Sequence, residues 1–130
     1  DHLAVDTALV APGDFHLRVD ARGGIDLDDG PRLHGVRPSV DVALHSVAQH
    51  FENRTLAVIL TGMGHDGADG TQAIKQAGGT VFAEDESTCV VWGMPRAVFE
   101  RGLADRVVPL DGMAEAVGHA LASRSVASHR

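Results

Sequence analysis

The sequence is poor in cysteine, in aromatic residues and in basic residues, and each shortage excludes a class of protein. Cys89 is the one cysteine, so the chain can form no internal disulfide and needs no oxidising compartment. Aromatic residues make up 4% of the chain and hydrophobic residues 44%, so the core must be aliphatic. The formal net charge of −7 argues against non-specific binding to nucleic acid or to an anionic membrane.

Long apolar runs are also missing. No stretch approaches the roughly 20 apolar residues that span a bilayer. The first residues carry Asp1, Asp6 and Asp14, whereas a signal peptide begins with a basic segment. With one domain's worth of chain, 130 residues, we expect a cytoplasmic protein without a membrane segment, whose partners are small molecules or other proteins.

The first third of the chain predicts short strands followed by a helix. Strands are expected at 7–13, 15–19 and 25–28, with the turn pair Gly23-Gly24 before the last, which makes a β-hairpin segment. The helix is expected at 39–51, where Ser39 can cap its start and the apolar positions recur at spacings of three and four.

The remainder alternates between strand and helix patterns. A fully buried strand is expected in "TLAVILT" (55–61), and the elements expected after it are a helix at 67–77, a strand at 80–84, a helix at 95–101, a strand at 105–110 and a last helix with Met113, Val117, Ala120 and Leu121 on one face. This order predicts an α/β, doubly wound domain with a largely parallel sheet and helices on both faces. Residues 122–130 are predicted to form a disordered tail.

The segment "LTGMGHDGADG" at residues 60–70 contains the first candidate site. Its glycines match the G-x-G-x-x-G pattern that follows a strand in dinucleotide-binding folds: Gly62, Gly64 and Gly67. Glu84 lies near the offset at which such folds place their ribose ligand. A nucleotide site is therefore one interpretation of this loop.

Two acidic residues, one in this loop and one in the first turn of the helix that follows, argue against that interpretation. Asp66 and Asp69 place carboxylates where phosphates would sit, and like charges about 4 Å apart repel by roughly 4 kcal/mol at an effective dielectric of 20. Asp66 instead suits the dipole at the start of the following helix. It can be the orienting acid of a Ser-His-Asp arrangement or a helix-terminal carboxylate that serves stability alone.

Several segments together resemble the catalytic domain of the bacterial chemotaxis protein-glutamate methylesterases, the CheB family. The matching segments are "ALVAPGDFHL" (8–17), "RPSVDVALHSVAQH" (37–50), "AVILTGMGHDGADG" (57–70), "QAGGTVFAEDESTCVVWGMPRAVFERG" (76–102) and "VVPLDGMAEAV" (107–117). The resemblance implies a Rossmann-like three-layer domain that hydrolyses glutamyl methyl esters on chemoreceptors and deamidates receptor glutamines. It implies no cofactor and no metal.

The resemblance assigns roles to residues where the motif matches. Asp66 falls on the acid of the catalytic triad, and Met63 falls on the residue whose backbone N–H contributes to the oxyanion hole. The family's serine turn and its histidine stretch do not occur in this sequence, so residues 1–121 are expected to be the C-terminal portion of an N-terminally truncated catalytic domain. Its implied partners are methylated chemoreceptor helices, a receiver domain or the missing N-terminal segment, and a second copy through self-association.

Three alternatives remain beside the methylesterase interpretation: an inactive interaction fragment, a half-domain completed by another chain and a nucleotide-binding α/β module. The histidines, eight in number, show no ligand spacing and are interpreted as surface residues. His65 beside Asp66 is expected to face solvent. Cys89 is expected to be a small buried hydrophobic residue, since no basic neighbour would lower the pKa of its thiol.

Overall fold

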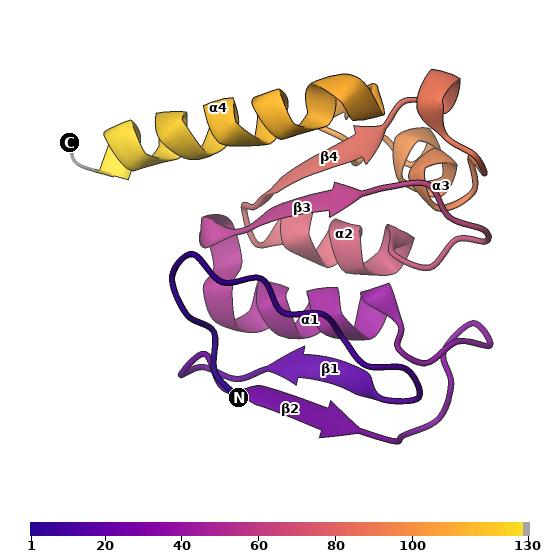
Figure 1. Ribbon diagram of the computed structural model, residues 1–130, viewed down its shortest axis with the longest axis vertical. Helices are drawn as coiled ribbons and strands as arrows, with labels where there is room; N and C mark the ends of the chain where they lie inside the picture. Colours follow the sequence, from indigo (N-terminus) through magenta and orange to yellow (C-terminus); the bar gives the residue numbers. More distant parts are fainter. Residues whose placement is uncertain (129–130) are drawn as a thin grey trace.

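A parallel three-stranded sheet forms the centre of the computed structural model, which describes residues 1–128 (Figure 1). Its order is β3 (Leu56–Ile59), β4 (Thr80–Glu84) and β5 (Arg106–Val108), and β4 pairs with both neighbours. Each crossover between these strands contains a helix, as parallel pairing requires. The α/β class and the parallel sheet predicted from the sequence are confirmed.

Helices cover both faces of this sheet. On one face α4 (Leu110–Ser128) packs through Met113 and Ala116 against β4 and β5. On the other face the core joins β3 and β4 to the remaining helices, which are α1 (Val40–Phe51), α2 (Ala68–Gln76) and α3 (Met94–Glu100). Short 3₁₀ turns follow α1 at Glu52–Arg54 and β4 at Glu86–Thr88. The result is the expected three-layer arrangement.

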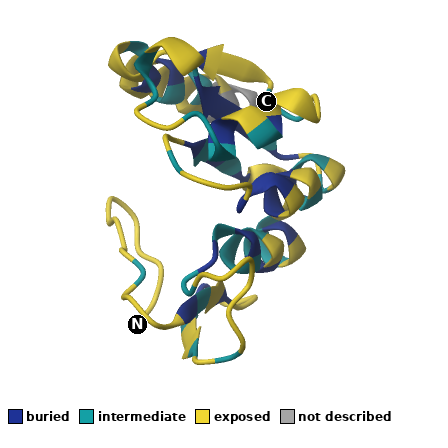
Figure 2. Ribbon diagram, turned by 90° about the vertical axis from the view of Figure 1, so that its right-hand side faces the viewer, coloured by how far each residue is buried: buried dark blue, intermediate teal, exposed yellow. Residues whose placement is uncertain are grey.

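The predicted hairpin is present and packs on α1 rather than on the central sheet (Figure 1). It consists of β1 (His16–Val19) and β2 (Ile25–Asp28), paired antiparallel. The strand predicted at 7–13 is wrong. That segment has no regular structure, and it is almost entirely exposed (Figure 2), because no strand of the described chain lies beside it to pair with its backbone.

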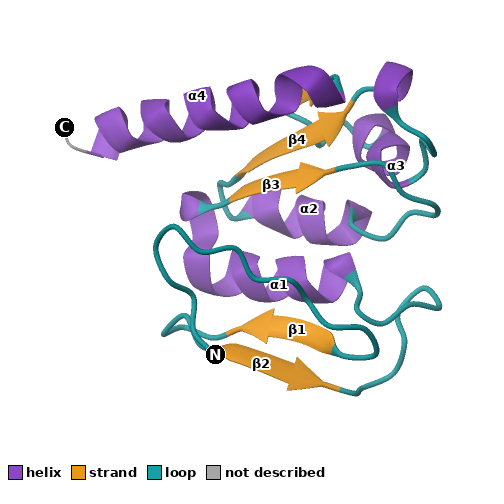
Figure 3. Ribbon diagram, in the orientation of Figure 1, coloured by secondary structure: helices purple, strands orange, loops and turns teal. Residues whose placement is uncertain are grey.

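Two further expectations need correction. Strand β3 is not fully buried, because it pairs only with β4 among the described residues and leaves Leu56 and Val58 half-buried. Helix α4 continues to Ser128, past residue 121, and extends beyond the sheet (Figure 3), so Leu121 is 52% exposed instead of facing the core. Disorder of the tail stays a prediction, and residues 129–130 lie outside the described part.

Across residues 1–128 no helix combines the length and the apolar character that crossing a membrane requires.

Candidate active site

The loop between β3 and α2 lies at the carboxyl end of a parallel strand, where α/β sheets place their sites. It carries both predicted site residues, Met63 and Asp66. Asp66 is buried at 8% exposure, whereas the Met63 side chain is 82% exposed. Gly67 follows Asp66 with a φ of 104°, a conformation that favours glycine, and it turns the chain into α2.

The carboxylate of Asp66 is held by the start of α1. Its Oδ1 accepts hydrogen bonds from the Ser39 hydroxyl at 2.7 Å and from the Asp41 N–H at 3.1 Å. Its Oδ2 accepts one from the Val40 N–H at 2.6 Å. The sequence predicted that the dipole of α2 would stabilise Asp66, and this stays a prediction; the hydrogen bonds of its side chain all come from the N-terminus of the neighbouring helix α1.

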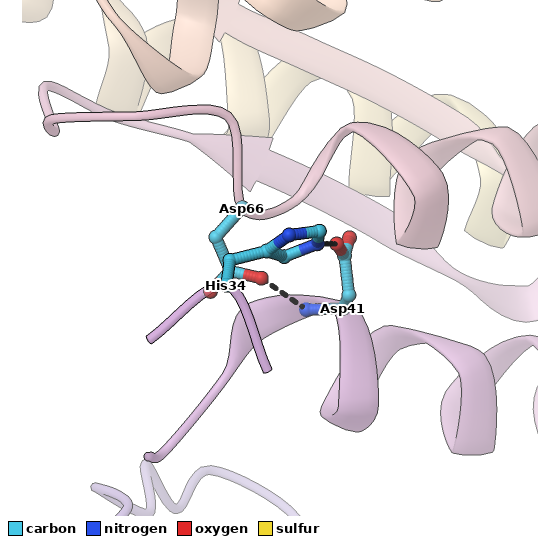
Figure 4. A group of neighbouring side chains, drawn as sticks. All are labelled: His34, Asp41 and Asp66. Atoms are coloured by element: carbon cyan, nitrogen blue, oxygen red, sulfur yellow. Dashed lines mark hydrogen bonds and ion pairs between the residues drawn. The ribbon is translucent and has the colours of Figure 1, made fainter. Parts of the chain in front are cut away.

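Asp41, in the first turn of α1, accepts hydrogen bonds from the start of α2. Its Oδ1 accepts hydrogen bonds from the Gly67 N–H at 2.9 Å and from the Gly70 N–H at 2.7 Å, both at the start of α2. The side chain of Asp41 is 1% exposed, and its Oδ2 lies 3.1 Å from Nε2 of His34 (Figure 4). The start of α1 therefore donates to Asp66, which lies in the loop just before α2, and the start of α2 donates to Asp41, which lies in α1. Sequence analysis missed Asp41, although an acid in the first turn of a helix is a usual signal.

This arrangement bears on the nucleotide interpretation. Phosphates bind at helix N-termini through backbone N–H groups that have no intrahelical partner. At α2 the Gly67 and Gly70 N–H groups donate to Asp41, and the Ala68 N–H donates to the His65 carbonyl at 3.2 Å. A carboxylate of the chain itself therefore occupies the place that a phosphate would need.

The buried side chain of His16 holds the backbone of Ser39 in place. The ring of His16 is 2% exposed, and its Nδ1 accepts a hydrogen bond from the Ser39 N–H at 3.2 Å. Nε2 lies 2.8 Å from the Pro31 carbonyl, so the ring is the tautomer with its proton on Nε2. His16 is thus a buried structural residue, and its interpretation as a surface histidine was wrong. His65 is exposed as expected and packs edge-on to His34 at 4.4 Å.

The backbone around Met63 is clamped to the segment before α3. The Gly62 N–H donates to the Val91 carbonyl at 3.1 Å, and the Gly62 carbonyl accepts from the N–H groups of Gly93 and Met94 at 3.1 and 2.8 Å. A Cβ on Gly93 would lie 2.6 Å from the Gly62 carbonyl oxygen, so glycine is required for this approach. Within residues 1–128, the Met63 N–H donates to no acceptor.

Glu84, the last residue of β4, supports the same loop. Its carboxylate is 1% exposed and accepts hydrogen bonds from the Thr61 N–H at 2.8 Å and the Thr88 hydroxyl at 2.9 Å. Thr61 in turn exchanges hydrogen bonds with the backbone of Val91 through its hydroxyl. Glu84 is therefore a buried anchor of the loop, and its carboxylate is not exposed to bind the ribose of a nucleotide. Its role was not visible in the sequence, because it depends on contacts across the sheet.

Cys89, which lies near this anchor, is a half-buried free thiol. Burial raises the pKa of the thiol, and the negative charge of Glu84 raises it further. Every neighbour that shifts this pKa among the described residues raises it, which disfavours the nucleophilic thiolate.

One group of possible metal ligands assembles among the described residues: His34, Asp41 and Asp66, with ligand atoms within 4.8 Å of one another. The sequence did not predict this group. Its two carboxylates already accept five hydrogen bonds from backbone and hydroxyl donors. The geometry of these side chains is therefore that of a hydrogen-bonded junction between α1 and α2 more than that of a metal site.

The fold and the loop define a class of protein: an α/β domain that presents a buried acid, Asp66, and an N–H unpaired among the described residues, that of Met63, at the carboxyl end of a parallel strand. A sequence profile described as CheB methylesterase matches residues 1–117. The chain belongs to the CheB methylesterase family.

Individual relatives agree with this assignment. A protein named protein-glutamate methylesterase/protein-glutamine glutaminase from Symbiobacterium thermophilum is 51% identical over 121 residues, which cover 93% of this chain and 33% of the relative. One of the same name from Pyrococcus abyssi is 48% identical over 117 residues, covering 88% and 32%. The crystal structure of the Thermotoga maritima CheB methylesterase catalytic domain superposes with a TM-score of 0.78 at 49% identity, covering 81% of this chain and 57% of that one. The chain thus spans about one third of the length of these two curated relatives.

Proposed function

We propose that this chain is the acid-bearing part of a protein-glutamate methylesterase catalytic domain, in which Asp66 orients the catalytic histidine and the Met63 N–H stabilises the oxyanion. The reaction is hydrolysis of glutamyl methyl esters on chemoreceptor helices, with deamidation of glutamine as the related activity that the relatives' names contain. No cofactor or metal takes part. The serine and the histidine come from a segment that this sequence does not include.

The observation that carries the proposal is the hydrogen bonding of Asp66. An ionised carboxylate offers about four acceptor positions. Three are used by Ser39, Val40 and the Asp41 N–H, two on Oδ1 and one on Oδ2. One position on Oδ2 is left, which is what an imidazole Nδ1–H needs from an orienting acid. The three bonds already made fix the direction in which that position points.

The backbone at Met63 supports the second role. An oxyanion donor must be unpaired in the resting protein and must sit on a rigid backbone. The Met63 N–H has no acceptor within residues 1–128, while the neighbouring Gly62 is bonded through both its N–H and its carbonyl. The N–H is therefore free while the backbone beside it is fixed.

The proposed partners follow from the reaction and from the edge of β3 that is unpaired among the described residues. Methylated receptor helices are the proposed substrate, and the segment with the serine and histidine is the proposed structural partner, together with a receiver domain. A cytoplasmic location fits a substrate of this kind. Neither nucleic acid nor a membrane is a proposed partner, because the net charge of −7 repels both kinds of polyanionic surface.

The test is a fusion in which residues 1–121 replace the corresponding part of the Thermotoga maritima catalytic domain. Methanol release from methylated receptor should appear in the fusion and be absent from the 130-residue chain alone. Asp66→Ala should lower kcat by about 10⁴, the order seen when the acid of such a triad is replaced. The matched control is Asp69→Ala, which removes a nearby acid from the first turn of α2, where it pairs with Arg101 outside the proposed triad, and should leave kcat within two-fold.

Each outcome bears on the proposal. Hydrolysis by the fusion that survives Asp66→Ala would show that Asp66 is not the orienting acid. Hydrolysis by the isolated chain at the rate of the fusion would show that the chemistry needs no further segment, and the triad assignment would then be wrong.

A further inference from the structure

We infer that Asp41 is a positioning residue for hydrolysis, which holds the catalytic loop so that Asp66 faces the histidine. The inference rests on the proposed function of Asp66. It concerns a residue that sequence analysis did not select and that lies on a different helix from the loop it controls.

The first step is the location of the hydrogen bonds that Asp41 accepts. Gly67 is the residue directly after Asp66, and its N–H lies 2.9 Å from Oδ1 of Asp41. Gly70 lies one turn further on, and its N–H lies 2.7 Å from the same oxygen. Both sides of the junction at which the loop enters α2 are therefore tied to one atom. A shift of that atom moves the backbone that carries Asp66.

The second step is the close approach of the two helices. A Cβ on Gly70 would lie 2.7 Å from Cβ of Leu44 and 3.1 Å from Oδ1 of Asp41. The glycine at this position therefore lets α1 and α2 approach closely enough for the short side chain of an aspartate to reach. A longer acid at position 41 would not fit the same gap.

The third step is reciprocity. The Asp41 backbone N–H donates to Asp66, while the Asp41 carboxylate accepts from the residue after Asp66. The two aspartates thus form a closed ring of hydrogen bonds between two helix N-termini. Charge-assisted hydrogen bonds of this kind are stronger than neutral ones, so the ring holds its geometry firmly. Asp41 does not touch the substrate in this arrangement and acts through Asp66.

The test uses three variants, Asp41→Ala, Asp41→Asn and the control Asp69→Ala. In the 130-residue chain, hydrogen exchange at the Gly67 and Gly70 amides is followed by NMR. Exchange should be at least ten-fold faster in Asp41→Ala and less accelerated in Asp41→Asn, whose amide oxygen can still accept. Asp69→Ala should leave both amides within two-fold of wild type.

The same variants are then assayed in the fusion described above, per folded enzyme and below each melting temperature. The expected order of kcat is wild type, then Asn, then Ala, with a loss of at least ten-fold in Ala and an unchanged KM. The acid limb of the pH profile of kcat should move to lower pH, because a misplaced Asp66 no longer stabilises the imidazolium. A variant that merely contained fewer correctly folded molecules would show a lower kcat at every pH, with the acid limb at the same pH as in wild type.

Failure of the inference can be told from failure of the proposed function. If Asp66→Ala abolishes hydrolysis but the Asp41 variants keep kcat and the acid limb of wild type, only the inference is wrong. If Asp66→Ala is active, the proposed function itself fails. Should Asp41→Ala not fold, Asp41→Asn decides: a reduced kcat with a shifted acid limb supports the inference, and a wild-type profile despite faster exchange at Gly67 overturns it.

Discussion

The Ser39 hydroxyl donates a hydrogen bond of 2.7 Å to Oδ1 of Asp66, so the residue that caps the N-terminus of α1 also holds the proposed catalytic acid. Ser39 is 1% exposed, so water cannot reach that side of Asp66 to replace the hydrogen bond from the Ser39 hydroxyl. Stability and chemistry therefore depend on the same hydroxyl.

Replacing Ser39 by alanine should accordingly lower the free energy of unfolding by about 1–2 kcal/mol, the usual cost of losing a helix cap. The fusion enzyme should also lose kcat, because Asp66 keeps only its two backbone donors. Urea denaturation and methanol release measure the two effects. Ser87→Ala, at a serine near the surface that bonds only to Asp85, is the control. A Ser39→Ala chain as stable as wild type would contradict the described junction.

Nucleotides should not bind. The N–H groups of Gly67 and Gly70 are occupied by Asp41, and Asp66 and Asp69 add negative charge nearby. Calorimetric titration of the chain with NAD and with ATP should show no heat of binding at millimolar ligand. A dissociation constant in the low micromolar range would revive the nucleotide interpretation, and Asp66→Asn should then tighten binding.

Gly93→Ala should distort the loop around Met63. The added Cβ would meet the Gly62 carbonyl oxygen at 2.6 Å and the Gly64 nitrogen at 2.9 Å, both of them backbone atoms. Overpacking of this kind costs about 1–3 kcal/mol, and the oxyanion donor should move with the loop. The matched control is Gly13→Ala, since nothing lies within 4 Å of a Cβ there. Equal urea midpoints for the two variants would contradict the described clamp.

The thiol of Cys89 should react slowly near neutral pH. Burial and then the charge of Glu84 raise its pKa, so the thiolate fraction is smaller than in a free cysteine. A thiol of raised pKa contributes stability that is present below its unfolded pKa and is lost as the pH rises through its folded pKa. Alkylation followed against pH should show a midpoint above that of glutathione.

Glu84→Gln tests the cause of that shift. It removes the negative charge near Cys89 while keeping an oxygen that can accept from the Thr61 N–H. Alkylation should become faster at each pH below the midpoint. An unchanged midpoint would mean that burial, together with the charges of Asp85 and Glu86, raises the pKa of the thiol without a contribution from the charge of Glu84.

The isolated chain should self-associate. Strand β3 has no partner on its outer side among the described residues, and beside it lies an apolar pocket of about 360 Å³ whose lining includes Leu9, Leu17 and Leu56. An unpaired edge next to an apolar surface favours pairing with another chain, over more than about 1,000 Å² for a stable contact. Sedimentation velocity should show dimers or larger species. Addition of the segment that carries the serine and histidine should return the chain to a one-to-one complex, whereas a stable monomer at high concentration would contradict this prediction.

The elements with strong local signals could be predicted from the sequence. The helix that follows Ser39 and the strand at 80–84 were predicted correctly, because capping, periodicity and flanking glycines all agree there. The strand at 7–13 failed because a strand needs a neighbour, which its own residues cannot reveal. Leu9, in that unpaired segment, is 39% exposed, whereas Ile59 in β3 is 4% exposed beneath α2 and α1.

The candidate site was predictable only in part. The motif around residues 60–70 indicated Asp66 and Met63, and these assignments remain predictions until the fusion is assayed. The contributions of His16, Asp41 and Glu84 depend on contacts between elements that lie far apart in the sequence. No local pattern records which carboxylate will meet which helix start, so the exchange of caps between α1 and α2 could be found only in the folded chain.

The exchange of caps has a consequence for how members of this family evolve. Because Asp66 satisfies the start of α1, a gene copy that has lost its serine or histidine would still be selected to keep this aspartate, merely in order to fold. The aspartate would therefore persist in a copy that had lost hydrolysis. A survey of the family that scored only this acid would count such a copy as an enzyme, so the serine and the histidine have to be scored as well.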